Sequence, residues 1–487
     1  MPDLFGQKHD YTWMFGYNFE QQSDPAGWGC DLLFTETPPA FILRPGRSMF
    51  IDQSHAAISD ATGQLQFYYN GCMIHGPNDS LMENGGGLNP GEIADLVCPD
   101  NYNTSQDVII LPHPDTIGLY DMFHHSTEIF TLAGGVKTID DDRLLRTRVD
   151  MRANQGLGTV VVKNDVLQQD TFSSSLAAVR HSNGHDWWII QRGQRNNFFY
   201  TFLYSGDTIT GPFPQETGIP FIGANGSAYA LFSPQGDRFA ISQWEVGCML
   251  FDMDRSTGKL SNFIHLPIPD SDTIRAMSCA FSPSGRYLYV AAYFEIYQYD
   301  LEAIDIAASQ KVVVHYDYTL CGLQTAFYWM QLGPDCKIYV IAPNGIRCMS
   351  VMHYPDNPVP DCGFSHNEIF MPTYNGISLP YYPNYRLGNA PVCDSSISVH
   401  IIPHIPVPSE GLKVIPNPTS GRITLTGLTD GSAYDLQLMD LTGREMATWT
   451  GQFSPIELDL SPWPNGLYFL VIDGLRSRET IRLIKTE

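Results

Sequence analysis

The chain has 487 residues, of which 43% are hydrophobic and only 16% are charged, with 42 Gly, 34 Pro, 25 Tyr and 26 Phe. This length is enough to bury a large core, and many turn formers and aromatic residues with few charges favour strands over helices. The formal net charge of −24 argues against binding to nucleic acid or anionic lipid, because both are polyanions. The composition therefore predicts an acidic all-β protein.

The N-terminal residues Met1–Gly6 contain neither a basic segment nor an apolar one, so no signal peptide is visible. The chain has no apolar run of the roughly 18 residues that a membrane-spanning helix needs. If the protein is exported, we expect its signal to have been removed or to lie outside this numbering.

A strand, a tight turn and a second strand recur at a nearly fixed interval. The turn positions are Gly184, Gly236, Gly285 and Cys336, which are 52, 49 and 51 residues apart. A period near 50 with several short strands is typical of β-propeller blades. One blade leaves both of its sheet faces bare, so neighbouring blades have to stack around an axis.

Two weaker copies lie upstream, at Ile58–Tyr69 and Val108–Phe123, which makes six units. The interval from Gly118 to Gly184 widens to 66 residues, which predicts an inserted loop or short helix near Asp140–Thr171.

A seventh blade would combine Leu379–Asn384 with the N-terminal segments Trp13–Tyr17 and Asp31–Phe34. Joining the two chain ends in one blade closes a ring and protects its sheet edges. We therefore predict a β-propeller over residues 1–393, with seven blades favoured and six as the alternative.

The character of the chain changes after Cys393. Three prolines lie within residues 403–408, and proline stiffens a chain and cannot donate to a β-ladder, so residues 394–411 are predicted to be a linker. Residues 412–487 alternate apolar and polar positions between turns, which predicts a small immunoglobulin-like β-sandwich of about seven strands.

Three motifs follow one another in this last segment. The first comprises Pro416, Asn417, Pro418 and Gly421, the second Asp440 and Gly443, and the third Asn465, Gly466 and Tyr468 with a basic final strand that carries Lys485. In this order they resemble the type A C-terminal sorting domain of type IX secretion system cargo. An ordinary fibronectin-like module is the alternative.

The resemblance implies that the outer-membrane secretion machinery of a Gram-negative bacterium recognises residues 412–487. It also implies that the protein is secreted or displayed on the cell surface, and that the sorting domain is commonly removed. The segments His181–Trp188, Phe251–Gly258 and Tyr297–Leu301 resemble uncharacterised propellers that often precede such domains. That likeness implies a fold and a location but no activity.

Carboxylates at alternate positions make Asp252 and Asp254 a candidate calcium site. The further ligands of an EF-hand loop are missing, so a hairpin turn is the favoured interpretation. His124 and His125 are adjacent in a strand-like segment and should face opposite ways, which makes a shared metal difficult. The run Asp140–Asp142 is interpreted as solvated charge. We predict no cofactor.

The sequence contains no HExxH, GxSxG, Walker or dinucleotide-binding motif. We therefore favour a binding or assembly module for an extracellular protein or glycan. The alternative is a secreted hydrolase or lyase whose site lies in the axial cleft of the propeller. Most aromatic residues are expected to pack between blades, with a sugar-binding platform as the other interpretation of runs such as Phe327–Trp329.

Four hydroxyl residues follow an aspartate in a pattern that resembles a bacterial O-glycosylation sequon: Ser80, Thr116, Thr208 and Thr273.

The chain has ten cysteines and no CxxC pair, so disulfides are more plausible than a zinc site. Cys336 stands where sibling units have glycine, and we predict that it forms a disulfide with Cys348. Cys248, in an apolar strand, is as readily a buried free thiol.

The largest departures from the blade period are the glycines Gly85–Gly87 and the segment Asp140–Thr171. Both belong to the first two recognised units, so we expect them to lie side by side and to carry any partner contacts. The alternative is that they cap the ring and cover a sheet edge.

Overall fold

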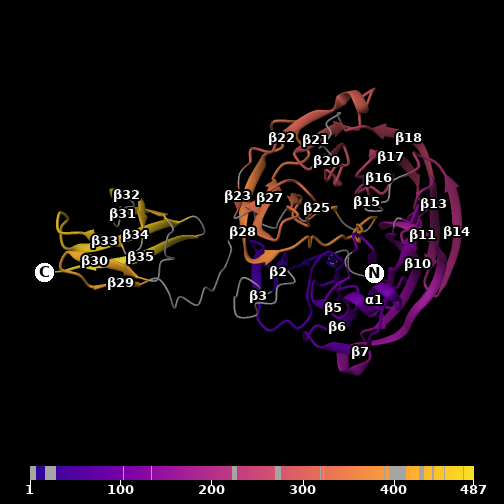
Figure 1. Cartoon of the computed structure of the whole chain (residues 1–487), viewed down its shortest axis with the longest axis horizontal. Coiled ribbons are helices and arrows are strands. Elements are labelled where there is room, and N and C mark those ends of the chain that lie inside the picture. The colour runs from indigo at the N-terminus through magenta and orange to yellow at the C-terminus, as the bar shows by residue number, and fades with distance from the viewer. Residues whose placement is uncertain are drawn as a thin grey trace. The chain divides into compact units, whose positions relative to one another are not determined.

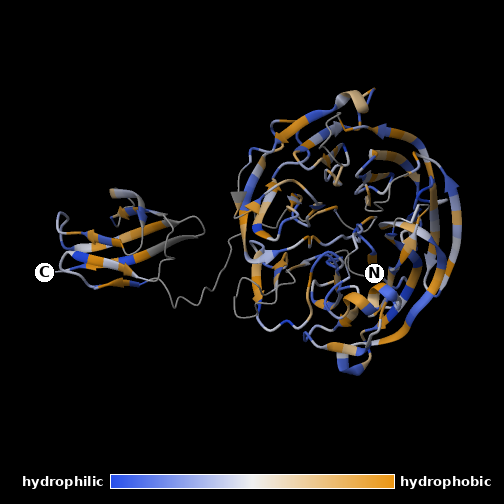
Figure 2. Ribbon diagram, viewed as in Figure 1, coloured by the Kyte–Doolittle hydropathy of each residue, from blue (hydrophilic) through white to orange (hydrophobic). Residues whose placement is uncertain are grey.

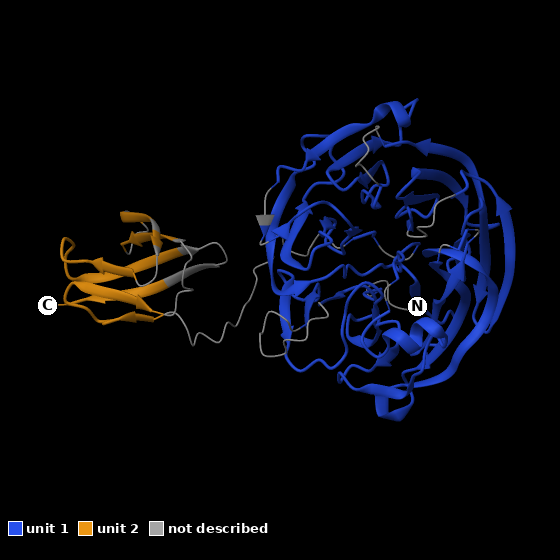
Figure 3. Cartoon of the chain, viewed as in Figure 1, with its two compact units in different colours: residues 1–405 blue, residues 406–487 orange. Residues whose placement is uncertain are grey.

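The computed structural model describes residues 7–486, except 17–28, 103, 133, 136, 222–227, 269–275, 319, 322, 389–390, 394–412, 427–432, 441–443, 454–455 and 475–476. The chain divides into two compact units, residues 1–405 and 406–487 (Figure 3). The described part of the first unit consists of strands, one short helix α1 (Glu92–Val97), and 3₁₀ turns at Asn154–Gly156 and Ala307–Ser309. No helix in the described ranges is long and apolar enough to cross a membrane.

The described strands of the first unit form seven blades around an axis (Figure 1). Blade 1 contains β1 (Thr12–Phe15), β2 (Gly29–Leu33) and β3 (Ala40–Arg44), and blade 2 contains β4 (Ala56–Ser59), β5 (Leu65–Tyr69), β6 (Met73–His75) and β7 (Leu81–Gly86). Blade 3 contains β8 (Val108–Pro112), β9 (Leu119–Thr131), β10 (Lys137–Asp150) and the start of β11 (Thr159–Arg180). Blade 4 contains the end of β11, β12 (Trp187–Gly193), β13 (Phe198–Ser205) and β14 (Thr208–Glu216).

Blades 5 to 7 are regular four-stranded antiparallel sheets. Blade 5 contains β15 (Ala228–Phe232), β16 (Arg238–Gln243), β17 (Gly247–Asp254) and β18 (Lys259–Leu266). Blade 6 contains β19 (Ser278–Phe281), β20 (Tyr287–Ala291), β21 (Glu295–Asp300) and β22 (Lys311–His315). Blade 7 contains β25 (Met330–Leu332), β26 (Ile338–Val340), β27 (Ile346–Met352) and β28 (Phe364–Asn375). A two-stranded pair, β23 (Leu320–Cys321) and β24 (Leu323–Gln324), precedes blade 7. The prediction of an all-β propeller with seven blades is confirmed.

The innermost strands of neighbouring blades contact one another: β4 contacts β8, β11 contacts β15, β15 contacts β19 and β19 contacts β25. The recurrent turn after each inner strand has the backbone that its sequence predicts. Gly184, Gly236 and Gly285 have φ values of 74°, 74° and 76°, a region that glycine enters without steric cost. Cys336 has the same conformation, with φ at 66°.

The predicted insertion near Asp140–Thr171 is not a loop or helix. The 14 residues of β10 and the 22 residues of β11 are long strands. The first part of β11 pairs with β10 in blade 3, and its last part pairs with β12 in blade 4. The blade period widens here because β9 and β10 have 13 and 14 residues, whereas the corresponding strands of blade 5, β16 and β17, have 6 and 8.

The second unit is a two-sheet sandwich of seven described strands. One sheet contains β29 (Lys413–Ile415), β30 (Arg422–Thr426) and β33 (Ile456–Asp459), and the other contains β32 (Glu445–Phe453), β31 (Ala433–Met439), β34 (Gly466–Gly474) and β35 (Ser477–Lys485). In β30, Ile423 and Leu425 are buried while Arg422 and Thr426 are exposed, and Figure 2 shows this apolar–polar alternation as banding along the strands. The predicted linker, residues 394–411, lies outside the described residues.

Candidate functional site

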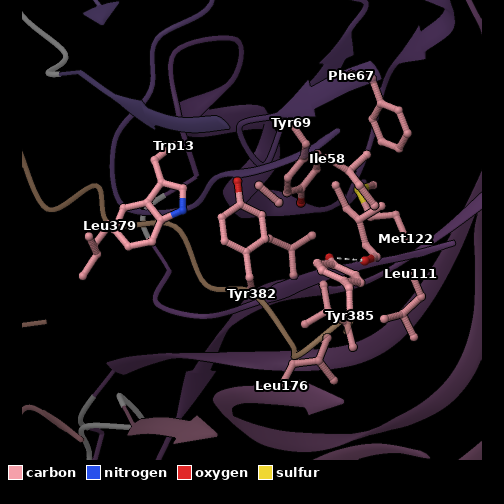
Figure 4. Close-up of a cluster of buried hydrophobic side chains, with 14 of the residues drawn as sticks. Trp13, Ile58, Phe67, Tyr69, Leu111, Met122, Leu176, Leu379, Tyr382 and Tyr385 are labelled. Atoms are coloured by element: carbon pink, nitrogen blue, oxygen red, sulfur yellow. Dashed lines mark hydrogen bonds between the residues drawn. The ribbon is translucent and has the colours of Figure 1, made fainter. Parts of the chain in front are cut away.

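The axis of the propeller is filled by the end of the first unit. Leu379–Asn384 was predicted to be a strand of blade 1; it lies beside β1 but is not a strand. The reason is chemical, because Pro380 and Pro383 cannot donate to a β-ladder. We call residues 376–387 the axial segment. Figure 4 shows Leu379, Tyr382 and Tyr385 among buried side chains from β1, β4, β8 and β11.

Side-chain bonds replace the missing ladder. The Tyr382 hydroxyl donates to the Thr12 carbonyl of blade 1 (2.7 Å), and the Tyr385 hydroxyl donates to the Ile110 carbonyl of blade 3 (2.7 Å). Further bonds reach blades 4 and 5, because Arg180 donates to the Tyr385 carbonyl (3.4 Å) and the Asn384 amide donates to Pro234 (2.7 Å). The axial segment thus touches inner elements from across the ring.

A second side chain enters the axis from the connection between blades 2 and 3. Gln106 accepts a hydrogen bond from the Ala230 N–H (2.7 Å) of blade 5 and donates to the Leu176 carbonyl (3.3 Å) of blade 4. The ring centroid of Tyr381 lies 6.1 Å from that of Tyr229 in blade 5. The middle of the axis is therefore packed with the protein's own side chains.

The axis retains two hollows of about 60 Å³ each. The one beside the first residues of β15 and β25 is lined by Ser105, Ala228, Met277, Trp329 and their neighbours. The one at the opposite end is lined by Leu231, Phe281, Gln331, Asn384 and their neighbours. Asp10 is the acidic residue among those that line it. Its carboxylate is held by both terminal nitrogens of Arg386, at 2.6 and 2.7 Å. Such a bidentate pair fixes the axial segment to blade 1 and leaves the carboxylate engaged.

A buried polar cluster lies where blades 3 and 4 meet. His125 forms an ion pair with Asp141 (3.0 Å) and shares a hydrogen bond with Gln191 (2.7 Å). Burial lowers the pKa of His125, but the Asp141 carboxylate outweighs it and raises this pKa overall. Burial, then the nearby Asp141, raises the pKa of Asp107 to about 7. Asp107, His125 and Asp141 lie on separate segments of the chain, so the sequence alone does not connect them.

The interpretation of Asp140–Asp142 as solvated charge is wrong. All three residues are buried in β10, and each carboxylate has a partner: Arg195 for Asp140 (2.9 Å), His125 for Asp141 (3.0 Å) and Arg143 for Asp142 (2.9 Å). Paired charges can be buried where isolated ones cannot. The partner of Asp140 comes from the turn after β12 and that of Asp141 from β9, so the run itself gives no sign of them.

His124 and His125 point to opposite sides of β9. His124 shares hydrogen bonds with Asn89 (2.6 Å) and Thr147 (2.8 Å), whereas His125 faces Asp141 and Gln191. Among the described residues, no group of three His, Cys, Asp or Glu side chains could hold a metal ion.

Asp252 and Asp254, the candidate calcium ligands, lie at the end of β17. Asp254 accepts hydrogen bonds from the Ser256 N–H (2.8 Å) and the Thr257 hydroxyl (2.7 Å). The hydrogen bonds from Ser256 and Thr257 lower the pKa of Asp254 to about 2. Asp252 accepts one from the Asn262 amide (2.6 Å). The arrangement serves the hairpin between β17 and β18.

Ser80 and Thr116 lie between strands, Thr208 is the first residue of β14, and Thr273 lies outside the described residues. Ser80 and Thr208 are exposed and Thr116 is half-buried. Asp207, which precedes Thr208, accepts a hydrogen bond from Arg148 (2.5 Å).

The prediction that Cys336 pairs with Cys348 is wrong. Cys336 is bonded to Cys393, while Cys348 is bonded to Cys321 and Cys72 to Cys98. The turn after β25 puts Cys336 next to the chain that follows the axial segment. Cys348 lies within β27, opposite Phe370. Cys248 is a buried free thiol.

The glycine segment and the 140–171 segment lie side by side, because β7 and β11 pair at Glu83 and Thr159. Lys163 donates to the Asn84 carbonyl (3.1 Å) and the Gly86 carbonyl (2.9 Å). Gly85 and Gly86 belong to β7 and not to a loop. Four aliphatic side chains along β7, β11 and the turn before β11 are exposed, with exposed fractions of 57%, 39%, 50% and 52% for Leu81, Leu157, Val161 and Val166. We call these four residues the aliphatic surface.

In the sandwich, the Pro416–Pro418 motif ties the start of the unit to its last strand. The Asn417 amide donates to the Arg482 carbonyl (2.7 Å), and its oxygen accepts from the Ile484 N–H (2.9 Å). The side chain of Asn417 therefore pairs with backbone groups on the edge of β35 that does not face β34. A Cβ at Gly421 would lie 2.6 Å from the Ser461 hydroxyl, so this position requires glycine or a shift of its neighbour.

The second and third motifs also bond within the sandwich. Asp440 accepts from the backbone and side chain of Arg444, both at 3.1 Å, and Gly443 lies outside the described residues. The Tyr468 hydroxyl donates to the Pro464 carbonyl (2.7 Å) across the turn that holds Asn465 and Gly466. Lys485 donates to the Ser461 carbonyl (3.3 Å). These motif residues therefore shape the fold of the unit.

The geometry defines a β-propeller followed by a small β-sandwich. Residues 413–486 match the family model described as a secretion system C-terminal sorting domain. The chain is type IX secretion cargo, and it is secreted or displayed at the cell surface. No curated protein matches the chain.

Similar solved structures include three propeller-sized chains. A putative 6-phosphogluconolactonase from Bacteroides uniformis is 12% identical to this chain; the match covers 76% of this chain and 98% of that protein, with a TM-score of 0.38. The periplasmic gluconolactonase PpgL of Pseudomonas aeruginosa is 13% identical, with coverages of 64% and 93% and a TM-score of 0.34. The Dos1 propeller is 10% identical, with coverages of 69% and 91% and a TM-score of 0.34.

Proposed function

We propose that the propeller acts outside the cell as a binding or assembly module for another protein. The observation that carries this proposal is the filled axis. A hydrolase or lyase of the kind considered from the sequence would use the axial cleft, and here Gln106, Tyr381 and the Asp10–Arg386 pair occupy it. Binding would then use the outside of the ring.

The aliphatic surface favours a protein partner over a glycan. Its exposed side chains are Leu and Val, whereas sugars stack on aromatic rings and protein interfaces bury apolar patches. Lys163 and Asp165 lie on the same strand and would form part of a polar rim. The pairing of β7 with β11 also serves the alternative role of covering a sheet edge, so the test has to separate binding from stability.

The test substitutes one exposed valine at a time in the secreted protein. Val161→Glu should lower binding to washed cells of the producing strain at least tenfold, because it replaces an exposed apolar side chain of β11 with a charge. Val312→Glu, on the exposed face of β22 in a regular blade, is the matched control and should bind like the wild type. Protease treatment of the cells should remove binding, while periodate treatment should not. Equal binding by both variants would contradict the assigned surface.

A loss of melting temperature in Val161→Glu, with unchanged binding of the folded fraction, would instead assign β7 and β11 to edge covering. Release of a cleaved product from the cell surface by the wild-type protein would favour the hydrolase alternative.

A further inference from the structure

The Cys336–Cys393 disulfide lies between the axial segment and the chain that leads to the sorting domain. Its cysteines are 57 positions apart, and the enclosed chain contains β26, β27, β28 and the axial segment. On the propeller side, Cys336 belongs to the turn that joins β25 to β26, where the Cys336 N–H donates to the Gly333 carbonyl (3.2 Å). The disulfide thus connects residue 393 directly to the body of blade 7.

The axial segment is held by contacts that follow one another along the chain. From its end backwards they are Leu387 in a cluster with Val179 and Trp188, the Arg386–Asp10 pair, and the bonds of Tyr385 and Tyr382. A force on a free chain end at residue 393 would break them one after another, since each contact feels the force only after the previous one has opened. Serial opening of this kind needs less force than opening them together.

We infer that the Cys336–Cys393 disulfide is a mechanical latch that shields the axial segment from forces applied to the chain beyond residue 393. The sorting domain is the part of the cargo that the secretion machinery engages, so any force exerted on the cargo during export enters the chain beyond residue 393. With the disulfide in place, that force passes from Cys393 to Cys336 and into blade 7. The axial segment, which closes the ring, carries none of it. This inference rests on the sorting domain and not on the proposed binding function.

The latch can be tested by pulling single molecules of the full chain. One handle is attached through a click-reactive amino acid at Ile304, a fully exposed residue of blade 6, and the other at the C-terminus. Cys336→Ser/Cys393→Ser should show an extra extension of roughly 50 Å, at a lower force than ring unfolding, as the axial segment peels off at about 3.3–3.6 Å per residue. The wild type should lack this event. Cys72→Ser/Cys98→Ser removes the disulfide that joins blade 2 to the end of α1 and should behave like the wild type.

Identical traces from the wild type and Cys336→Ser/Cys393→Ser would overturn the inference. If that variant does not fold, wild-type protein is folded first and its tether is then treated with dithiothreitol. The early extension must appear on reduction in both the wild type and Cys72→Ser/Cys98→Ser, and its absence there would overturn the latch equally. Binding to cells is not measured in either experiment, so failure of the latch and failure of the proposed function are distinguishable.

Discussion

The hydroxyl of Tyr382 donates to the carbonyl of Thr12, 370 positions earlier in the chain, over 2.7 Å. Both residues are buried, and the bond joins the axial segment to the first strand of blade 1. Propellers have to join their chain ends to avoid open sheet edges. Here that junction is made by side chains on a proline-containing segment and not by a β-ladder.

Tyr382 should therefore contribute substantially to the free energy of unfolding of the propeller. Tyr382→Phe removes one buried hydrogen bond and should lower the free energy of unfolding by about 1 kcal/mol. Tyr382→Ala also leaves a cavity and should lower it by about 3–5 kcal/mol. Urea unfolding of the isolated propeller measures both. Tyr354→Ala, at a tyrosine that is 59% exposed, is the control, and a loss as large as that of Tyr382→Ala would contradict this account.

Asp107 should make stability depend on pH. Burial, then Asp141, raises its pKa to about 7, whereas an unfolded chain has an Asp pKa of about 3.9. Because the folded state holds this proton more tightly, the stabilising contribution is complete below pH ~4 and is lost as the pH rises through about 7.

Asp107→Asn cannot ionise and should escape that loss. Between pH 5 and pH 8 the wild type should lose about 2 kcal/mol of unfolding free energy relative to Asp107→Asn. Urea titrations of both proteins at the two pH values give this difference directly. An unchanged difference would show that Asp107 is ionised in the folded protein at pH 5.

The sorting motif should act through the stability of the sandwich. Asn417→Ala removes both side-chain bonds to β35 and should destabilise the isolated residues 406–487 by about 1–2 kcal/mol, with a lower secreted yield. Glu457→Ala, an exposed change on β33, should alter neither. Thermal unfolding and extracellular yield are measured in parallel. If Asn417→Ala abolished secretion without any change in stability, Asn417 would instead be a direct contact of the machinery.

Exposed sequons should carry glycan in protein purified from its natural host. Ser80 and Thr208 are exposed, so their peptides should show hexose-containing mass shifts, while half-buried Thr116 should be modified less. Mass spectrometry of tryptic peptides gives the occupancy of each. Unmodified Ser80 and Thr208 peptides in the secreted protein would count against the sequon interpretation.

The repeat could be predicted because each blade is specified locally. Gly236 and Gly285 mark turns that need a positive φ, and their spacing sets the blade period. The sandwich could be predicted for the same reason, from alternation and turn residues. Residues 379–384 were placed beside the N-terminal strands correctly, because a ring has to close, but their prolines rule out the strand that was expected.

Pairings between distant residues could not be predicted. Nothing in the sequence near Cys336 points to Cys393, because their contact depends on the path of the axial segment. Likewise, the sequence predicts that Asp140 is solvated, because it gives no sign that the guanidinium of Arg195, in the turn after β12, lies 2.9 Å from the Asp140 carboxylate. The filled axis was missed for this reason, although Tyr381, Tyr382 and Tyr385 are an apolar-aromatic cluster unusual for a chain end. That cluster was the available signal.

The most direct test of this account is where the protein goes without its sorting domain. Deletion of residues 412–487 should leave a propeller with the circular dichroism and melting temperature of the first unit, because that unit has its own core. That folded propeller should accumulate in the periplasm and be missing from the medium and the cell surface. Normal extracellular yield of the truncated protein would contradict the account.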